Sequence, residues 1–114
     1  MSERELSLLL EDMIESIRYI LEFTNGLRLD EYEADAKTRH AVERNFEIIG
    51  EAASRVPSEF KSLHPQVEWR IIKDFRNFII HDYFGINQSI VWNTIEYRLP
   101  DLLKQLTLLL KDFR

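Results

Sequence analysis

The sequence of 114 residues contains no cysteine, which excludes a disulfide framework and any metal site built on thiolates. Only three glycines and three prolines interrupt the chain, and no segment alternates between apolar and polar residues for long. No apolar run approaches the ~20 residues needed to cross a bilayer. The opening residues 1–5 are too acidic for a signal peptide. We therefore expect a cytoplasmic protein with no membrane partner.

A chain of this length, with 45% hydrophobic residues, fits one domain spanning residues 1–114 with its own core. Its net charge of −5 by itself argues against a nucleic-acid partner. Residues 1–35, however, contain ten acidic and three basic residues, a net charge of −7, whereas the remainder contains twelve basic and ten acidic residues, a net charge of +2. Any surface that binds RNA is expected on the later helices. The acidic opening segment is interpreted as a solvated face or as a docking site for a basic protein.

Apolar residues recur at helical spacing over four segments: residues 2–23, 35–55, 66–80 and 87–111. Ser2 and Glu5 have the spacing of a capping box, and Asn25-Gly26 is typical of a helix end. The pattern predicts an all-α protein, a four-helix bundle with a short extra turn between the first two helices. The residues expected to face the core are Leu6, Leu10, Met13, Ile17 and Leu21; Val42, Phe46, Ile49, Ala53 and Val56; and Val91, Ile95, Leu99, Leu102, Leu106 and Leu109.

Two residues interrupt the helical pattern. Gly50 lies inside the second helix at a cost of ~1 kcal/mol relative to alanine, which the close approach of a neighbouring helix would explain. Pro100 lies inside the fourth helix, where we expect a kink or a brief break. Charged residues on one face of the second helix are interpreted as a solvated surface with internal ion pairs; they are Lys37, His40, Arg44, Glu47 and Glu51.

The segment 76–83, Arg-Asn-Phe-Ile-Ile-His-Asp-Tyr, concentrates reactive side chains in a mostly apolar background. Arg76 keeps its charge and presents a planar fork that suits phosphate. His81 can transfer a proton near neutral pH, and Asn77 can both donate and accept hydrogen bonds. These are the groups needed to cleave an RNA phosphodiester without a metal ion. A structural helix can also carry the same residues without any chemistry.

Helical geometry divides this segment into two faces. The core face is expected to hold Ile71, Phe75, Phe78 and Ile79, with Ile72 at its margin, and the polar face Arg70, Lys73, Asp74, Asn77 and His81. Arg76 and His81 are five residues apart and diverge by roughly 140°, so one regular helix does not direct both at one phosphate. Either the helix unwinds near Asp82, or arginine and histidine converge across a two-fold interface. We favour the dimer, because Ile80 lies among polar residues on the side away from the core.

At these residues the sequence resembles the HEPN superfamily, and most closely the HepT-type toxins of HEPN–MNT toxin–antitoxin pairs. The pattern of this branch, Arg-x4-His-x-Tyr, is matched completely by Arg76, His81 and Tyr83. Asn77 supplies the polar residue that commonly follows the arginine. Two further segments are similar to the family: Phe84-Gly85-Ile86 and Gly50-Glu51-Ala52. The similarity in layout extends over essentially the whole chain.

The resemblance implies a metal-independent endoribonuclease without a cofactor, active as a homodimer with the motif helices at the interface. Arg76 would stabilise the charge of the phosphorane, His81 would transfer the proton of the 2′-hydroxyl or of the leaving oxygen, and Asn77 would position the phosphate or the histidine. The product would be a 2′,3′-cyclic phosphate, and DNA, which lacks the hydroxyl, would not be cleaved. Three residues are candidates for a supporting role: Lys73, Asp74 and Glu51.

The resemblance also makes Tyr83 the expected acceptor of AMP from an MNT-type nucleotidyltransferase antitoxin. A bulky anionic group at this position would occupy the phosphate site near Arg76 and repel RNA. The alternative for Tyr83 is an aromatic residue that packs on the dimer partner. The alternative for the whole chain is a non-catalytic helical module that binds nucleotide or a protein partner, and the net negative charge favours it.

Overall fold

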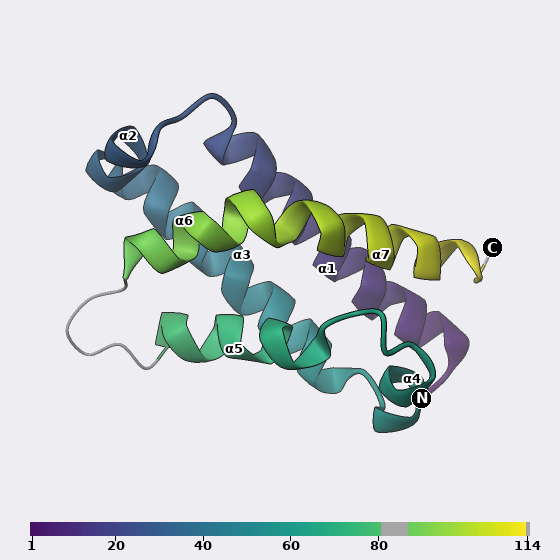
Figure 1. The fold of residues 1–114 in the computed structure, drawn as a ribbon. Helices are drawn as coiled ribbons and strands as arrows, with labels where there is room; N and C mark the ends of the chain where they lie inside the picture. The colour runs from purple at the N-terminus through teal and green to yellow at the C-terminus, as the bar shows by residue number, and fades with distance from the viewer. Residues whose placement is uncertain (81–86, 114) are drawn as a thin grey trace.

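The computed structural model describes residues 1–80 and 87–113, except for the side chains of residues 78–80. In this part of the chain all regular secondary structure is α-helical, which confirms the predicted fold class. None of these described helices is both long and apolar enough to cross a membrane. The helices are α1 (Glu3–Thr24), α2 (Leu29–Ala34), α3 (Ala36–Arg55), α4 (Ser58–Leu63), α5 (Trp69–Ile80), α6 (Gln88–Tyr97) and α7 (Leu99–Lys111) (Figure 1).

The two longest helices, α1 and α3, run antiparallel side by side and form the framework of the bundle (Figure 1). α1 begins with the predicted capping box. The Ser2 hydroxyl accepts a hydrogen bond from the backbone N–H of Glu5 at 3.1 Å, and the Glu5 carboxylate accepts one from the N–H of Ser2 at 3.3 Å. After α1, Gly26 has a φ of 80°, a left-handed conformation that glycine adopts without steric cost. Both predicted ends of this helix are confirmed.

The core lies between these two helices, α5 and the C-terminal pair α6–α7. All the core residues predicted for the first, second and fourth helices are buried, except Leu21, which is partly buried at the edge. Phe46 of α3 and Phe75 of α5 pack edge to face, with ring centroids 5.2 Å apart. The prediction for α5 needs a correction. Ile72, expected at the margin, is 1% exposed, whereas Ile71, expected on the core face, is only partly buried. Both line a small cavity beside the α6–α7 junction, so the difference reflects the rotation of α5 about its axis, which places Ile72 deeper in the core than Ile71.

The predicted fourth helix consists of α6 and α7, which continue in nearly the same direction across the bundle (Figure 1). The Asn87 side chain begins α6 by accepting hydrogen bonds from the N–H groups of Ser89 and Ile90, at 3.1 and 3.2 Å. α6 ends at Tyr97, and Pro100 lies in the first turn of α7, where a missing N–H breaks no helical hydrogen bond. The predicted break near this proline is confirmed.

Two short helices occupy the connections. The extra turn expected between the first two helices is α2, whose Tyr32 is completely buried with its ring centroid 5.1 Å from that of Trp92. α4 was not predicted, and α5 begins at Trp69 instead of near residue 66. Pro57 lies two residues after the end of α3. Its φ of −61° is also compatible with a helix start, so it precedes α4 directly.

Candidate active site

The candidate active site lies where α5 crosses α3 (Figure 1). A β-carbon added to Gly50 of α3 would lie 2.6 Å from Cβ of Arg76 and 3.4 Å from its Cα and backbone nitrogen. Two carbon atoms pack at about 3.5–4.0 Å, so the crossing requires a residue without a side chain. The prediction that Gly50 marks the close approach of another helix is confirmed. The approaching helix is the one that carries the motif arginine.

The Arg76 guanidinium is held by Glu51, the residue that follows Gly50. Nη2 of Arg76 lies 3.3 Å from Oε2 of Glu51. The other carboxylate oxygen, Oε1, lies 3.4 Å from Nη2 of Arg55, one turn further along α3. The carboxylate thus bridges two guanidinium groups. The side chains of Arg76 and Glu51 are 43% and 47% exposed, so water screens their attraction, and the pair contributes at most ~1 kcal/mol to stability.

Among the described residues, the contact with Glu51 orients Arg76 and leaves other guanidinium donors for a ligand. A guanidinium carries five N–H donors in a rigid fork, and the contact with Glu51 is made by one of its nitrogen atoms, Nη2. Phosphate oxygens can accept hydrogen bonds from other N–H groups of the guanidinium, or displace Glu51 at small cost because the pair is weak. The supporting role predicted for Glu51 stays a prediction, and its contact with Arg76 is the geometry that such a role requires.

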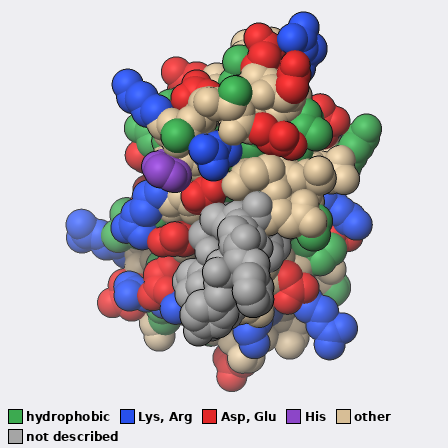
Figure 2. Space-filling view, turned by 90° about the vertical axis from the view of Figure 1, so that its left-hand side faces the viewer, with side chains coloured by type: hydrophobic (Ala, Val, Ile, Leu, Met, Phe, Trp, Pro, Cys, Tyr) green, Lys and Arg blue, Asp and Glu red, His purple; other side chains and the backbone are tan. Residues whose placement is uncertain are grey.

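The other predicted residues of α5 lie on its outer side. Lys73, Asp74 and Asn77 are exposed, as the helical geometry predicts, and Arg76 lies on the border between the inner and outer faces. Figure 2 shows that acidic and basic side chains are interspersed at the end of the molecule where α5 ends. His81, Tyr83 and Asp82 lie outside the described residues. The convergence of Arg76 with His81, and the role of Asp74 beside it, therefore stay predictions.

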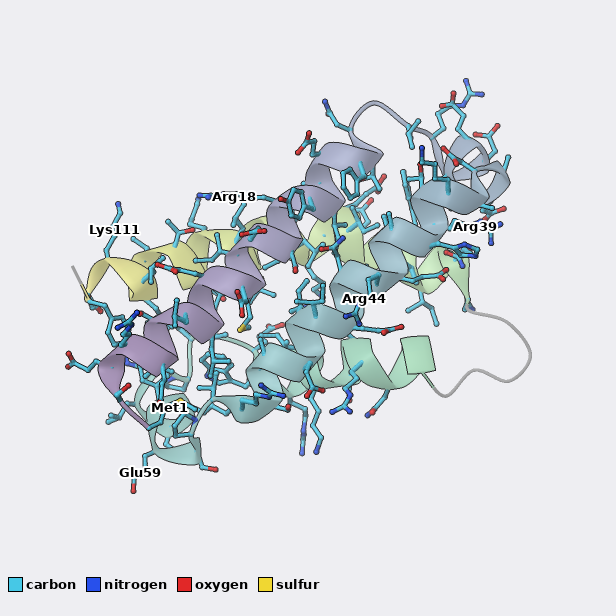
Figure 3. The ribbon with its side chains drawn as sticks, turned by 180° about the vertical axis from the view of Figure 1, so that it is seen from behind. Met1, Arg18, Arg39, Arg44, Glu59 and Lys111 are labelled. Atoms are coloured by element: carbon cyan, nitrogen blue, oxygen red, sulfur yellow. The ribbon has the colours of Figure 1, made fainter. Side chains whose placement is uncertain are left out.

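One member of this charged cluster was not predicted from the sequence. Arg55 was not identified, although the four-residue spacing from Glu51 to Arg55 is typical of an ion pair on one helix face. The charged face predicted on α3 does form ion pairs, since Arg44 also lies 3.3 Å from Glu47 (Figure 3). Among residues 1–80 and 87–113, no group of three or more histidine, aspartate or glutamate side chains is placed to hold a metal ion.

Comparison with known proteins identifies the family. The model of the family "Ribonuclease HepT-like" matches residues 13–109. The chain is 37% identical over 112 residues to "Putative RNase MJ0127" of Methanocaldococcus jannaschii, covering 98% of this chain and 93% of that protein. It is 42% identical over 93 residues to "Probable ribonuclease HepT" of Thermococcus cleftensis, covering 82% of this chain and 84% of that protein.

No solved structure matches the chain significantly. The family model nevertheless spans most of the chain, including α3, α5 and the crossing that holds Arg76. The alignments at 37% and 42% identity extend over most of this chain and most of each relative, so the similarity is not confined to one motif. The chain therefore belongs to the HepT-like ribonuclease family of the HEPN superfamily.

Proposed function

We propose that this protein is a metal-independent endoribonuclease that cleaves RNA with Arg76, Asn77 and His81, and that it is the toxin of a HEPN–MNT toxin–antitoxin pair. The observation that carries the proposal is the placement of Arg76. In a chain of a ribonuclease family, the backbone and Cβ of Arg76 pack on Gly50, its guanidinium contacts Glu51, and its side chain is still 43% exposed. Asn77, the next residue, is exposed beside it.

The chemistry follows from these groups. His81 takes the proton from a ribose 2′-hydroxyl, and the resulting oxygen attacks the adjacent phosphorus in line with the departing 5′-oxygen. Arg76 stabilises the additional negative charge of the phosphorane, and Asn77 positions the phosphate. The P–O5′ bond breaks and the leaving oxygen takes up a proton. The products are a 2′,3′-cyclic phosphate and a 5′-hydroxyl, and DNA is spared because it has no 2′-hydroxyl.

The proposed catalytic unit is a homodimer in which Arg76 of one protomer and His81 of its partner serve the same phosphate. Helical divergence of about 140° between these two positions supports this arrangement. In a two-fold dimer each site then takes its arginine from one chain and its histidine from the other.

Cleavage is tested with single-stranded RNA in the presence of EDTA, by electrophoresis of a labelled substrate. His81→Ala is expected to lower the rate by about 10²–10⁴-fold, because general acid–base catalysis contributes that much. Expression of the wild-type protein should slow growth, and expression of the variant should not. Equal tolerance of both proteins, with no RNA cleavage by either, would refute the ribonuclease proposal.

The shared site is tested by mixing two inactive variants, Arg76→Ala and His81→Ala. In a mixed dimer one of the two sites regains an intact arginine and an intact histidine. Statistical mixing makes half of the dimers mixed, so about one quarter of the wild-type rate should return. A site contained within one chain gives no recovery. Sedimentation that shows only a monomer at micromolar concentration would also contradict the shared site.

We further propose that a nucleotidyltransferase antitoxin of the MNT type silences the enzyme by transferring AMP to Tyr83. The anionic adduct would compete with RNA for Arg76. Co-expression with the candidate antitoxin should add whole AMP units to the intact mass, and Tyr83→Phe should abolish this increase. An unchanged mass together with loss of activity would instead indicate inhibition by steric blockade.

The second candidate is a non-catalytic module that binds a nucleotide or a protein. The acidic residues of α1 and α2 favour it, since a surface of this kind attracts a basic partner. The cleavage assay separates the two functions, because a binding module leaves RNA intact in every variant.

A further inference from the structure

A groove with a volume of about 340 Å³ lies next to the candidate active site, between the C-terminal part of α3, α4 and the first turns of α5. We call it the Trp69 groove. Its lining residues are Ala53, Ser54, Lys61, Trp69, Arg70 and Lys73.

The ionisable side chains of the Trp69 groove are all cationic: Lys61, Arg70 and Lys73. Among the described residues, none of the three has a carboxylate within ion-pair distance. Nearby acids are engaged elsewhere, since Glu51 pairs with Arg55 and Arg76, and Glu68 lies 3.3 Å from Arg98. Asp74 is exposed but does not line the groove. In a protein of net charge −5, this is a local positive site that a polyanion can use.

The aromatic wall of the groove is fixed in place. The indole Nε1 of Trp69 donates a hydrogen bond to the backbone carbonyl of His64 at 3.0 Å, and the ring packs edge to face on Phe60, with centroids 6.3 Å apart. Nζ of Lys61 lies 6.0 Å from the centroid of the same ring. A rigid aromatic ring beside ammonium and guanidinium groups is the combination that binds the bases and the backbone of single-stranded nucleic acids.

The groove lies within one helical turn of the candidate active site along both helices. Lys73 precedes Arg76 by three residues on α5, and Ser54 follows Glu51 by three residues on α3. Three residues of a helix correspond to about 4.5 Å along its axis. A strand with one phosphate at Arg76 therefore reaches the groove with its neighbouring nucleotides.

We propose that the Trp69 groove binds the single-stranded RNA that flanks the cleaved bond. Lys61, Arg70 and Lys73 contact its phosphates, and a base packs on the indole of Trp69. The inference rests on the proposed ribonuclease function for its choice of RNA as ligand. An acidic protein segment is the other polyanion that this charge would accept, and the test below separates the two.

The test measures binding without cleavage. The probe is a fluorescein-labelled single-stranded oligouridylate with 2′-O-methyl riboses, which lacks the attacking hydroxyl, and binding is followed by fluorescence anisotropy. Lys61→Gln/Arg70→Gln/Lys73→Gln should weaken binding at least tenfold at low salt. The slope of log affinity against log salt should become shallower by about 2, since each phosphate contact to a single strand contributes about 0.7.

A matched control removes the same charges elsewhere: Arg18→Gln/Lys104→Gln/Lys111→Gln. These residues are exposed on α1 and α7, and Arg18 and Lys111 lie away from α5 (Figure 3). The control has the same net charge as the groove variant and should keep the wild-type salt slope. Circular dichroism melting shows that both proteins are folded.

A second measurement observes the indole directly. In Trp92→Phe, the fluorescence of Trp69 is the only tryptophan signal, and the same oligonucleotide should quench it. Phenylalanine preserves an aromatic ring at position 92 against Tyr32. Binding without quenching would remove Trp69 from the proposal.

The outcomes for the groove and for the ribonuclease are distinct. If the wild-type protein cleaves RNA and the groove variant binds and cleaves as the control does, the groove proposal is wrong and the ribonuclease proposal stands. If the wild-type protein binds the probe through the groove but cleaves nothing, the groove stands and the catalytic proposal is wrong. If the wild-type protein does not bind the probe, the groove proposal is overturned and an acidic protein segment becomes the ligand to test.

Discussion

Gly50→Ala tests whether the crossing of α3 and α5 positions Arg76. The added methyl group would lie 2.6 Å from Cβ of Arg76, so α5 must move away by about 1 Å to reach ordinary carbon contact. Both atoms sit close to helix backbones, and no side-chain rotation relieves the clash. Overpacking of this kind costs about 1–3 kcal/mol, whereas alanine gains about 1 kcal/mol over glycine as a helix former. The net loss of unfolding free energy is therefore between about 0 and 2 kcal/mol.

Activity should change far more than stability. Displacement of a catalytic group by 1 Å can lower a rate by about 10²-fold, and Gly50→Ala moves the backbone that carries Arg76. The expected result is a folded protein whose RNA cleavage is roughly 100-fold slower. Urea denaturation followed by circular dichroism gives the stability, and initial rates on a labelled RNA give the activity.

Gly26→Ala is the matched control. Gly26 has a φ of 80°, and a β-carbon there would meet nothing within 4 Å, so alanine adds backbone strain of about 1–2 kcal/mol without displacing any helix. It should lose comparable stability and keep full activity. Gly50→Ala with full activity and unchanged or increased stability would show that the crossing tolerates a side chain, and the reasoning about Arg76 would be refuted.

Three further results are expected. Arg76→Lys should lower the rate of RNA cleavage nearly as much as Arg76→Ala, about 10²–10³-fold, because an ammonium lacks the planar fork. Glu51→Gln should lower the rate by less than about tenfold, since the ion pair that it removes is exposed. Burial, together with the Glu43 carboxylate, raises the pKa of Tyr32, so above about pH 10 the unfolded chain loses this proton while the folded protein keeps it. Stability should then fall by about 1.4 kcal/mol per pH unit, and urea denaturation at several pH values should show that Tyr32→Phe removes this dependence. Asn87→Ala removes the cap of α6 and should cost about 1 kcal/mol in thermal denaturation, whereas Asn87→Asp should retain the cap.

The fold was predictable wherever apolar spacing is long and regular. The core residues predicted for α1, α3 and α7 are buried, apart from Leu21 at the edge, because each of these helices presents an apolar stripe to a single core. The two six-residue helices are different. In α4 no residue is buried, so it leaves no apolar periodicity for a pattern to reveal. The error at Ile71 and Ile72 has a related cause. Either of two adjacent isoleucines fits the helical period of the core face, and the packing of neighbouring helices determines which one is buried.

For the candidate site, residue type and spacing selected Arg76 and Asn77, and their catalytic roles stay predictions. The unfavourable position of Gly50 inside a helix predicted a close approach of another helix, which the structure confirms. That the glycine and the arginine touch could not be read from spacing, because they are 26 positions apart and nothing local specifies which helix crosses which. The Trp69 groove was missed for the same reason. Lys61 belongs to a helix without a pattern, and its position above Trp69 depends on the turn that follows α4.

The net charge of −5 is a weak argument against RNA binding, because the charge is unevenly distributed over the molecule. The excess of acids lies on α1 and α2, and α3 separates α1 from most of α5 (Figure 3). The molecule extends over 42 × 29 × 20 Å, whereas charges at physiological salt are screened within about 8 Å. A strand bound along α5 therefore experiences Arg70, Lys73 and Arg76 much more strongly than the acids of the first helix. Lower ionic strength extends the range of the electrostatic field of the acids and of the cations. The acidic helices should then weaken the long-range attraction of RNA, while the cations beside the site still determine the affinity on contact.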